Sequence, residues 1–333
     1  MTSANGFPVF CPHPLFFGGH AQTLAGVYLP SGRFPYRAVR HAVTLPDGDR
    51  IVLHDDRPED WRLGGRLALL IHGLAGCHQS GYMVRVAAKL NARGVRTFRM
   101  DLRGSGAGFG LARFPYHAGR SEDARAAIAY LAELCTASPV TLIGFSLGAN
   151  IVLKLVGELA GEPCGHLDSA VAVCPPADLT ACSSRIARPT NRLYDRHFTS
   201  LLVRRIELHR DQLPDAPTFN NGRKPRTLYE LDDTFTAPIC GFGTADNYYR
   251  QASSLPLLGD VETPTLIVAA ADDPLVPSTQ FDGVRLSPAV QLEIAPGGGH
   301  LGFISRRTKF ADRRWMDWRI VDWVAQVSQA GSS

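Results

Sequence analysis

A glycine-flanked serine stands between a predicted strand and a predicted helix near the middle of the chain. The β-rich run 140–143 leads into the segment 144–148, which reads G-F-S-L-G, and the amphipathic stretch 150–156 follows. In a G-x-S-x-G turn the serine backbone is strained, because only glycines on both sides let the strand and helix approach closely. The pattern predicts that Ser146 exposes its hydroxyl at a helix N-terminus, where unpaired N–H groups can stabilise negative charge. Taken alone, it also fits a tight turn with a capping serine.

Short β-rich runs alternate with longer amphipathic stretches from about residue 39 onward. This alternation is typical of the α/β class, with a mainly parallel central sheet and helices on both faces. Strands are predicted at 66–71, 95–100, 140–145, 169–174, 265–269 and 290–294, after an antiparallel hairpin of 39–45 and 51–55. Helices are predicted at 81–93, 121–134, 146–159 and 308–327.

The alternation is interrupted at Pro175-Pro176. Residues from there to about 262 show polar and helical patterns with proline-rich breaks and no strong strand pattern. We therefore expect an inserted, mostly helical cap at 175–262. It would divide the core into a first part, 1–174, and a second part, 263–333.

Composition restricts the class of protein and its partners. The chain has 333 residues, 45% of them hydrophobic, enough to bury a large core without disulfide or metal staples. Its seven cysteines are scattered and form no C-x-x-C pair, which is typical of reduced thiols in an intracellular protein. The 35 basic residues are interspersed with 31 acidic ones, and no run combines basic and aromatic residues, so we expect no nucleic-acid partner.

The expected location is the cytoplasm. The N-terminal residues lack the basic and apolar regions of a secretory signal. No apolar run approaches the roughly 20 residues needed to span a bilayer. Peripheral membrane contact is left open, and the sequence does not indicate an oligomeric state.

Two further segments could complete a nucleophilic site around Ser146. Asp272 and Asp273 directly follow the strand 265–269, and His300 follows the strand 290–294 after three glycines. The order serine, acid, histidine is the order expected on an α/β sheet of this type. Either aspartate could serve as the acid, but the rigid turn begun by Pro274 favours Asp273. As isolated features, these residues also fit solvated turns.

A glycine-containing turn after the strand 66–71 predicts a second backbone donor. Residues 72–76 read H-G-L-A-G, and the N–H groups of Leu74 and Leu147 are the expected oxyanion hole. A simple turn is the alternative reading. The segment 104–110 lacks both the G-x-G-x-x-G spacing and a P-loop lysine. With no H-E-x-x-H motif and no Cys/His cluster, we expect neither a cofactor nor a metal.

Several segments together resemble one family, the YheT-like α/β-hydrolases, bacterial relatives of lipases and esterases with an α/β-hydrolase domain. The similar segments are 18–24, which contains H-x-Q-T, 72–76 with Ser80 and Tyr82, 102–104, 116–119, 122–123, 144–150, 272–274 and 298–303. The resemblance implies an α/β-hydrolase fold and a triad of Ser146, Asp273 and His300. One departure is Asp101, where the family usually has asparagine.

The resemblance implies a serine hydrolase that cleaves carboxylic esters through an acyl-enzyme, without a cofactor. Short- to medium-chain acyl esters are the expected substrates, and lipid esters are a further candidate. Cap residues expected to line an acyl pocket, or to form the cap's own core, are Tyr194, Phe198, Leu201, Leu202, Phe235 and Phe242. A thioesterase or acyltransferase would use the same triad, and a non-catalytic binding protein is a third alternative.

Overall fold

An eight-stranded sheet forms the centre of the computed structural model, which describes residues 6–330 except 31, 33, 211–218, 220–222 and 308. The strands are β1 (Val39–Thr44), β2 (Arg50–Asp56), β3 (Leu67–Ile71), β4 (Arg96–Asp101), β5 (Val140–Phe145), β6 (Leu167–Val173), β7 (Thr265–Ala270) and β8 (Val290–Ala295). Their spatial order is β1-β2-β4-β3-β5-β6-β7-β8. The β1–β2 and β2–β4 pairs are antiparallel and the other pairs are parallel, so the predicted α/β class with a mainly parallel sheet is confirmed.

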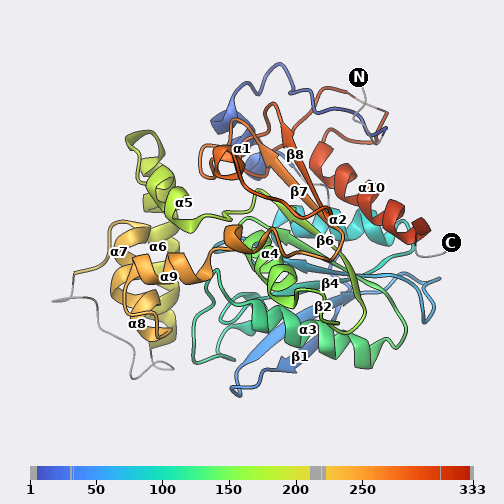
Figure 1. The fold of residues 1–333 in the computed structure, drawn as a ribbon, viewed down its shortest axis with the longest axis horizontal. Helices are drawn as coiled ribbons and strands as arrows, with labels where there is room; N and C mark the ends of the chain where they lie inside the picture. Colours follow the sequence, from blue (N-terminus) through green and yellow to red (C-terminus); the bar gives the residue numbers. More distant parts are fainter. Residues whose placement is uncertain are drawn as a thin grey trace.

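Helices cover both faces of the sheet (Figure 1). On one face, α3 (Ser121–Leu134) and α4 (Leu147–Leu159) pack against alternate strand residues such as Leu67 and Leu69. On the other face, α2 (Gly81–Asn91) and α10 (Trp315–Ala330) pack against the intervening residues, among them Leu70. This division follows from the two-residue period of a strand, which sends successive side chains to opposite faces.

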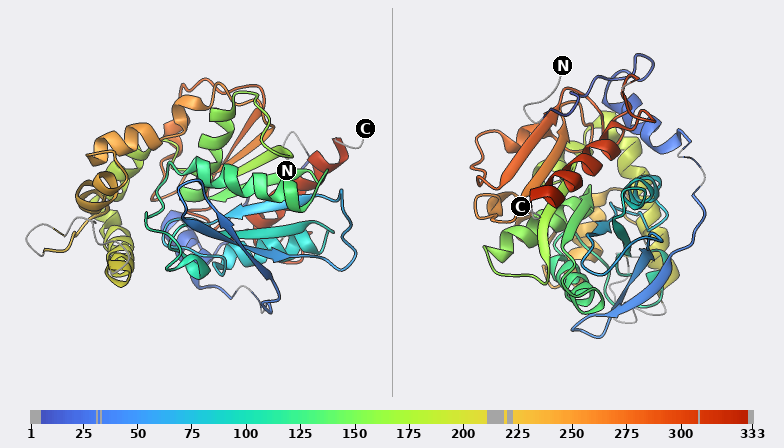
Figure 2. Two further views of the ribbon diagram at one scale, coloured as in Figure 1. Left: turned by 90° about the horizontal axis from the view of Figure 1, so that it is seen from below. Right: turned by 90° about the vertical axis from the view of Figure 1, so that its right-hand side faces the viewer.

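A mostly helical segment lies between β6 and β7, to one side of the sheet (Figure 2). We call it the α5–α9 segment; it comprises α5 (Leu179–Ile186), α6 (Arg192–His209), α7 (Leu228–Leu231), a π-helical turn (Asp232–Thr236), α8 (Ala237–Ile239) and α9 (Ala245–Ala252). It has a small apolar cluster of its own, which includes Val203, Leu231 and Phe235. Short 3-10 helices occur at Gly106–Gly108, Pro189–Asn191, Leu255–Leu257 and Ser278–Phe281.

The N- and C-terminal elements differ from the sequence prediction. A helix not predicted from periodicity, α1 (Gly19–Tyr28), contacts the loop that follows β8, and the last helix begins at Trp315 rather than near residue 308. The later start is explained by an isolated antiparallel bridge of Ile304 with Arg314 and by the Asp312 side chain, which accepts the Arg314 N–H. Among the described helices, none has the combination of length and apolar character needed to cross a membrane.

Candidate active site

Ser146 occupies the sharp turn between β5 and α4. Its backbone has φ 52° and ψ −121°, a region that residues with a side chain rarely adopt. A Cβ atom on Gly144 would lie 2.3 Å from the Gly148 carbonyl oxygen, and one on Gly148 would lie 2.5 Å from the Ile71 carbonyl oxygen. Only glycine fits at both positions, because the strand and the helix approach each other as closely as the sequence predicts. The Ser146 side chain lines a cavity at this turn.

A chain of two hydrogen bonds joins the serine to an aspartate. His300, in the loop after β8, has Nε2 2.8 Å from the Ser146 Oγ and Nδ1 2.8 Å from the Asp273 Oδ2. The carboxylate must accept from Nδ1–H, so Nε2 is left to accept the serine proton. Asp273 is buried, and its Oδ1 accepts the N–H groups of Leu275 (2.8 Å) and Val276 (3.0 Å).

The neighbouring aspartate has a different partner. Asp272 Oδ1 accepts the N–H of Gly299 at 2.8 Å, immediately before the histidine. Its hydrogen bond therefore shapes the glycine loop, whereas that of Asp273 orients the imidazole ring. Partial burial raises the pKa of Asp272, with the Asp273 charge adding to the effect.

The segment 18–24, near the N-terminus, hydrogen-bonds to the loop that contains His300. Thr23 Oγ1 accepts the backbone N–H of His300 at 2.8 Å and donates to the Gly19 carbonyl at 2.7 Å. Gln22 exchanges two hydrogen bonds with the backbone of Ile304. A Cβ on Gly19 would lie 1.7 Å from the Asp272 carbonyl oxygen. These supporting residues were not assigned a role from sequence, although the H-x-Q-T pattern marks their position.

Two backbone N–H groups remain for an oxyanion. Among the hydrogen bonds of the described residues, none uses the N–H of Leu74 or Leu147, and both residues line the cavity. The flanking N–H groups are occupied, since Gly73 donates to the Tyr82 phenol at 2.9 Å and Ala75 to the Tyr116 phenol at 2.8 Å. The two residues predicted to form an oxyanion hole thus present free donors beside Ser146.

A buried histidine supports residues 72–76, which we call the oxyanion loop after its predicted role. His72 Nδ1 donates to the Gly73 carbonyl at 2.8 Å, while Nε2 accepts the Leu102 N–H at 3.3 Å. Complete burial lowers the pKa of His72 to about 4, so the ring is neutral at physiological pH.

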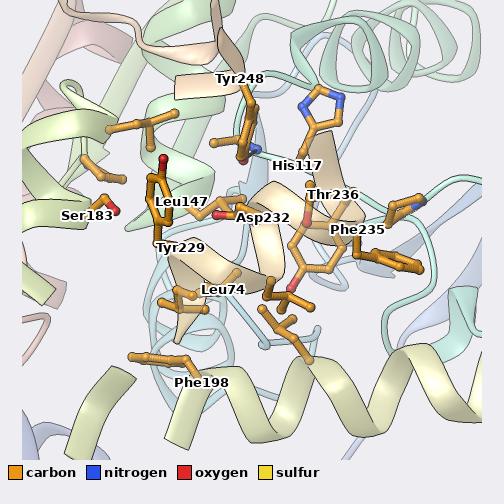
Figure 3. Close-up of a pocket in the computed structure, with 18 of the residues that line it drawn as sticks. Leu74, His117, Leu147, Ser183, Phe198, Tyr229, Asp232, Phe235, Thr236 and Tyr248 are labelled. Atoms are coloured by element: carbon orange, nitrogen blue, oxygen red, sulfur yellow. Dashed lines mark hydrogen bonds between the residues drawn. The ribbon is translucent and has the colours of Figure 1, made fainter. Parts of the chain in front are cut away.

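The cavity above Ser146 has a volume of about 240 Å³ and is bounded by the core loops and the α5–α9 segment (Figure 3). Of the six side chains suggested for an acyl pocket, Phe198, Leu202 and Phe235 line it. The other three lie elsewhere: Tyr194 stacks on His20, Leu201 is exposed, and Phe242 packs against Tyr248. Sequence periodicity could not separate these two groups, because both fit an apolar helix face.

Charged side chains also line the cavity, namely Arg103, Arg113, Asp195, Arg205 and Asp232, and sequence reasoning placed none of them there. Arg205 of α6 reaches the core and donates to Ser105 Oγ at 2.9 Å and to the Ala75 carbonyl at 3.4 Å. Asp232 begins the π-helical turn, and burial raises its pKa to about 6. Neither belongs to a recognisable motif, so only the folded arrangement reveals them.

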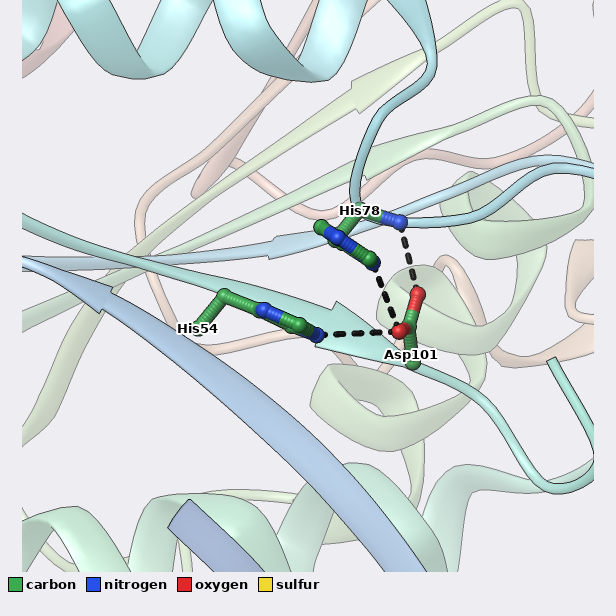
Figure 4. A group of neighbouring side chains, drawn as sticks. All are labelled: His54, His78 and Asp101. Atoms are coloured by element: carbon green, nitrogen blue, oxygen red, sulfur yellow. Dashed lines mark hydrogen bonds and ion pairs between the residues drawn. The ribbon is translucent and has the colours of Figure 1, made fainter. Parts of the chain in front are cut away.

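A second polar cluster lies outside this cavity (Figure 4). The Asp101 carboxylate accepts from His54 Nε2 (2.9 Å), His78 Nδ1 (2.7 Å) and the backbone N–H groups of His78 (2.6 Å) and Ala107 (2.7 Å). Burial opposes ionisation, but these hydrogen bonds outweigh it and hold the pKa of Asp101 well below its usual value. Four donors suit a carboxylate better than the single carbonyl oxygen of an asparagine, which accounts for the aspartate here.

Comparison with known proteins gives several similarities. A family model described as "Alpha/beta hydrolase family" matches residues 68–313. An Escherichia coli K12 protein named "Putative esterase YheT" is 31% identical over 99% of this chain and 98% of its own length. Mouse phospholipase ABHD3 is 27% identical over 74% of this chain and 61% of its own. The solved esterase Pf2001 of Pyrococcus furiosus, 15% identical, shares the fold with a TM-score of 0.56, over 89% of this chain and 96% of its own.

Proposed function

Because this chain belongs to the α/β-hydrolase family, we propose that it hydrolyses carboxylic esters through an acyl-enzyme on Ser146. The observation that carries the proposal is the hydrogen-bonded chain from Ser146 Oγ through His300 to Asp273, at 2.8 Å for each link. The esterase and phospholipase names of its relatives support an ester substrate.

In the proposed reaction His300 acts first as a base and then as an acid. Nε2 takes the Ser146 proton as Oγ attacks the acyl carbonyl, and the N–H groups of Leu74 and Leu147 stabilise the oxyanion. Nε2–H then protonates the departing alcohol, leaving the acyl group on Oγ. Asp273 orients the ring through Nδ1 and stabilises the imidazolium in both steps.

The second half of the reaction repeats the first with water. His300 removes a proton from water, which attacks the acyl carbon, and returns a proton to Ser146 Oγ as the carboxylic acid leaves. The products are one alcohol and one acid for each water consumed. No step requires a group beyond the side chains and N–H groups described.

We propose that the α5–α9 segment is a cap over the site, with the boundaries 175–262. Phe198, Leu202 and Phe235 give the cavity an apolar wall above Ser146. Such a wall suits the hydrocarbon of a short- to medium-chain acyl group. Lipid esters of that chain length fall within the same class.

The experiment is a rate profile over p-nitrophenyl esters from acetate to palmitate, with a fluorophosphonate probe as a second readout. Ser146→Ala should lower kcat by at least about 10³-fold and abolish probe labelling, because the nucleophile is lost. Ser200→Ala, an exposed serine of α6, serves as the matched control and should change neither. Full activity or labelling in Ser146→Ala would refute the proposal.

The same assay tests the three alternative functions, which are thioesterase, acyltransferase and non-catalytic binding protein. The thioester of the favoured acyl chain tests for a thioesterase, and addition of an alcohol acceptor tests for acyl transfer. A wild-type protein that binds these esters without turnover or labelling would indicate a non-catalytic binding protein.

A further inference from the structure

A carboxylate in the cavity has no part in the proposed reaction. Asp232 is partly exposed to the cavity that contains Ser146 and His300, at the start of the π-helical turn (Figure 3). The Tyr249 phenol donates to its Oδ2 at 2.8 Å, and the Thr236 side chain also hydrogen-bonds to it. Among the described residues, no lysine, arginine or histidine forms an ion pair with it.

The position is costly for an anion. The protein around Asp232 raises the pKa of its carboxyl to about 6, because burial disfavours the charged form. A leucine or phenylalanine would suit an apolar wall better. A carboxylate offers about four acceptor positions, and the two neighbouring hydroxyls leave room for another donor from the cavity side.

We propose that Asp232 and Tyr249 form a subsite that binds a hydroxyl group of the substrate, remote from the ester bond. The inference rests on the proposed ester hydrolysis and adds a specificity-determining contact to it. A buried acceptor discriminates strongly for a substrate that carries the matching donor, because the analogue without it leaves the carboxylate desolvated and unpaired.

Three other charged side chains line the cavity and have partners: Arg103 and Arg113 form ion pairs with Asp49, and the Asp195 carboxylate accepts the Leu228 N–H and the Thr199 hydroxyl. The remaining charge, Arg205, favours an uncharged donor over a cation. Arg205 lines the same cavity, and the acceptors of its hydrogen bonds are the neutral groups of Ser105, Tyr116 and Ala75. Among the described residues, no acidic side chain pairs with this guanidinium. Its charge opposes a substrate ammonium group. An alcohol supplies a donor without this repulsion.

The hydroxyl can come from either half of the ester. An acyl chain with a distal hydroxyl would extend along the apolar wall to Asp232, whereas a polyol ester would present the hydroxyl from its leaving group. Two matched pairs separate these sources: an aryl hexanoate with and without a terminal hydroxyl, and the glyceryl and propyl esters of hexanoic acid.

The test is the ratio of kcat/KM for each hydroxylated ester to that of its partner. We expect wild type to prefer the hydroxylated member of one pair by at least about tenfold, as a hydrogen bond to a charged group implies. Asp232→Leu should bring that ratio close to one, and Asp232→Asn, which keeps the shape, should lower it. Because the ratio compares two substrates of one protein, a general loss of activity leaves it unchanged.

Asp233→Asn is the matched control. Asp233 is the next residue of the same turn, but its carboxylate accepts the Ala245 N–H at 2.9 Å and does not line the cavity. This variant removes the same charge and should keep the wild-type ratio.

The inference fails if wild type shows no preference in either pair, or if the preference survives in Asp232→Leu or is unchanged in Asp232→Asn. It also fails if an Asp232-dependent preference for a trimethylammonium ester exceeds that for the hydroxyl ester. Failure of the proposed function gives a different result: wild type then cleaves no ester of either pair, or Ser146→Ala retains the activity.

Discussion

Two adjacent aspartates divide the work of positioning His300. Asp273 contacts the imidazole Nδ1, whereas Asp272 contacts the backbone N–H of Gly299. Only the first contact bears on the tautomer and the charge of the ring during a reaction. The second holds the loop, which Thr23 also holds.

Asp273→Asn should therefore lower kcat for a p-nitrophenyl ester by about 10³–10⁴-fold, because an amide can donate to Nδ1 and stabilise the wrong tautomer. Asp272→Asn should cost no more than about tenfold, since its carbonyl oxygen can still accept from Gly299. Steady-state kinetics on the two purified variants shows which aspartate is the acid of the triad. The reverse order of effects would assign the acid to Asp272.

The raised pKa of Asp232 predicts a pH-dependent stability difference. Its value is about 6 in the folded chain against 3.8 for the free group, so the folded state holds the proton more tightly between about pH 4 and 6. Stability contributed by this proton is lost as pH rises through that window. The melting temperature of Asp232→Asn, measured relative to wild type by circular dichroism, should thus increase from pH 4 to pH 7. A difference that is constant with pH would contradict the assignment.

The residues of the candidate site divide into predictable and unpredictable ones. Ser146 directly follows β5, and Asp273 and His300 lie in the loops that follow β7 and β8, so local sequence suffices to bring them to one edge of the sheet. Their catalytic roles stay a prediction. Thr23 contacts a segment far along the chain, and Asp232 reaches the cavity only through the arrangement of the α5–α9 segment, so no local pattern predicts either.

At the scale of elements, helix α6 connects the α5–α9 segment to the oxyanion loop. Arg205 projects from α6 to the Ala75 carbonyl, and the Ala75 N–H is held by Tyr116. Ala75 has φ 57°, a strained value for a residue with a side chain, so the loop needs external support to keep the neighbouring Leu74 N–H in place.

Arg205→Met should lower kcat about tenfold and weaken binding of a trifluoromethyl ketone, which mimics the tetrahedral intermediate, by a similar factor. KM and melting temperature should change little, because the apolar stem of the side chain is kept. Arg204→Met, an exposed neighbour on the same helix, is the control and should behave as wild type. A higher KM with unchanged kcat would instead indicate a role in substrate binding alone.

The elements show where periodicity succeeds and where it does not. The buried strands β3 and β5 were predictable because short apolar runs between turns have few alternatives. The π-helical turn Asp232–Thr236 and the late start of α10 were not. Tyr249 donates to a side chain of the turn, and the Ile304–Arg314 bridge precedes α10, and neither contact is visible in a local pattern. The cap boundaries 175–262 stay a prediction.

Over the whole molecule, several histidines are buried as neutral rings. Burial lowers the pKa of His72 to about 4, and it also lowers the pKa values of His54 and His117. Unfolding frees these rings to bind protons near pH 6.5, their usual pKa. The unfolded state therefore binds more protons than the folded state in this pH range, so acid favours unfolding.

The free energy of unfolding should accordingly fall as pH decreases from about 6.5 to about 4. His72 alone contributes about 3 kcal/mol of this change, and Asp232 offsets part of it. Urea denaturation at intervals across this range measures the effect. Constant stability over the window would show that the rings are charged or solvated in the folded state.

The attachment of His300 to Thr23 spans 277 positions of the chain. Thr23 is therefore translated long before the loop that it holds, which follows β8. A nascent chain can therefore form the serine turn long before the histidine arrives. The hydrogen bond between Ser146 and His300 can therefore form only after the segment that follows β8 has been made.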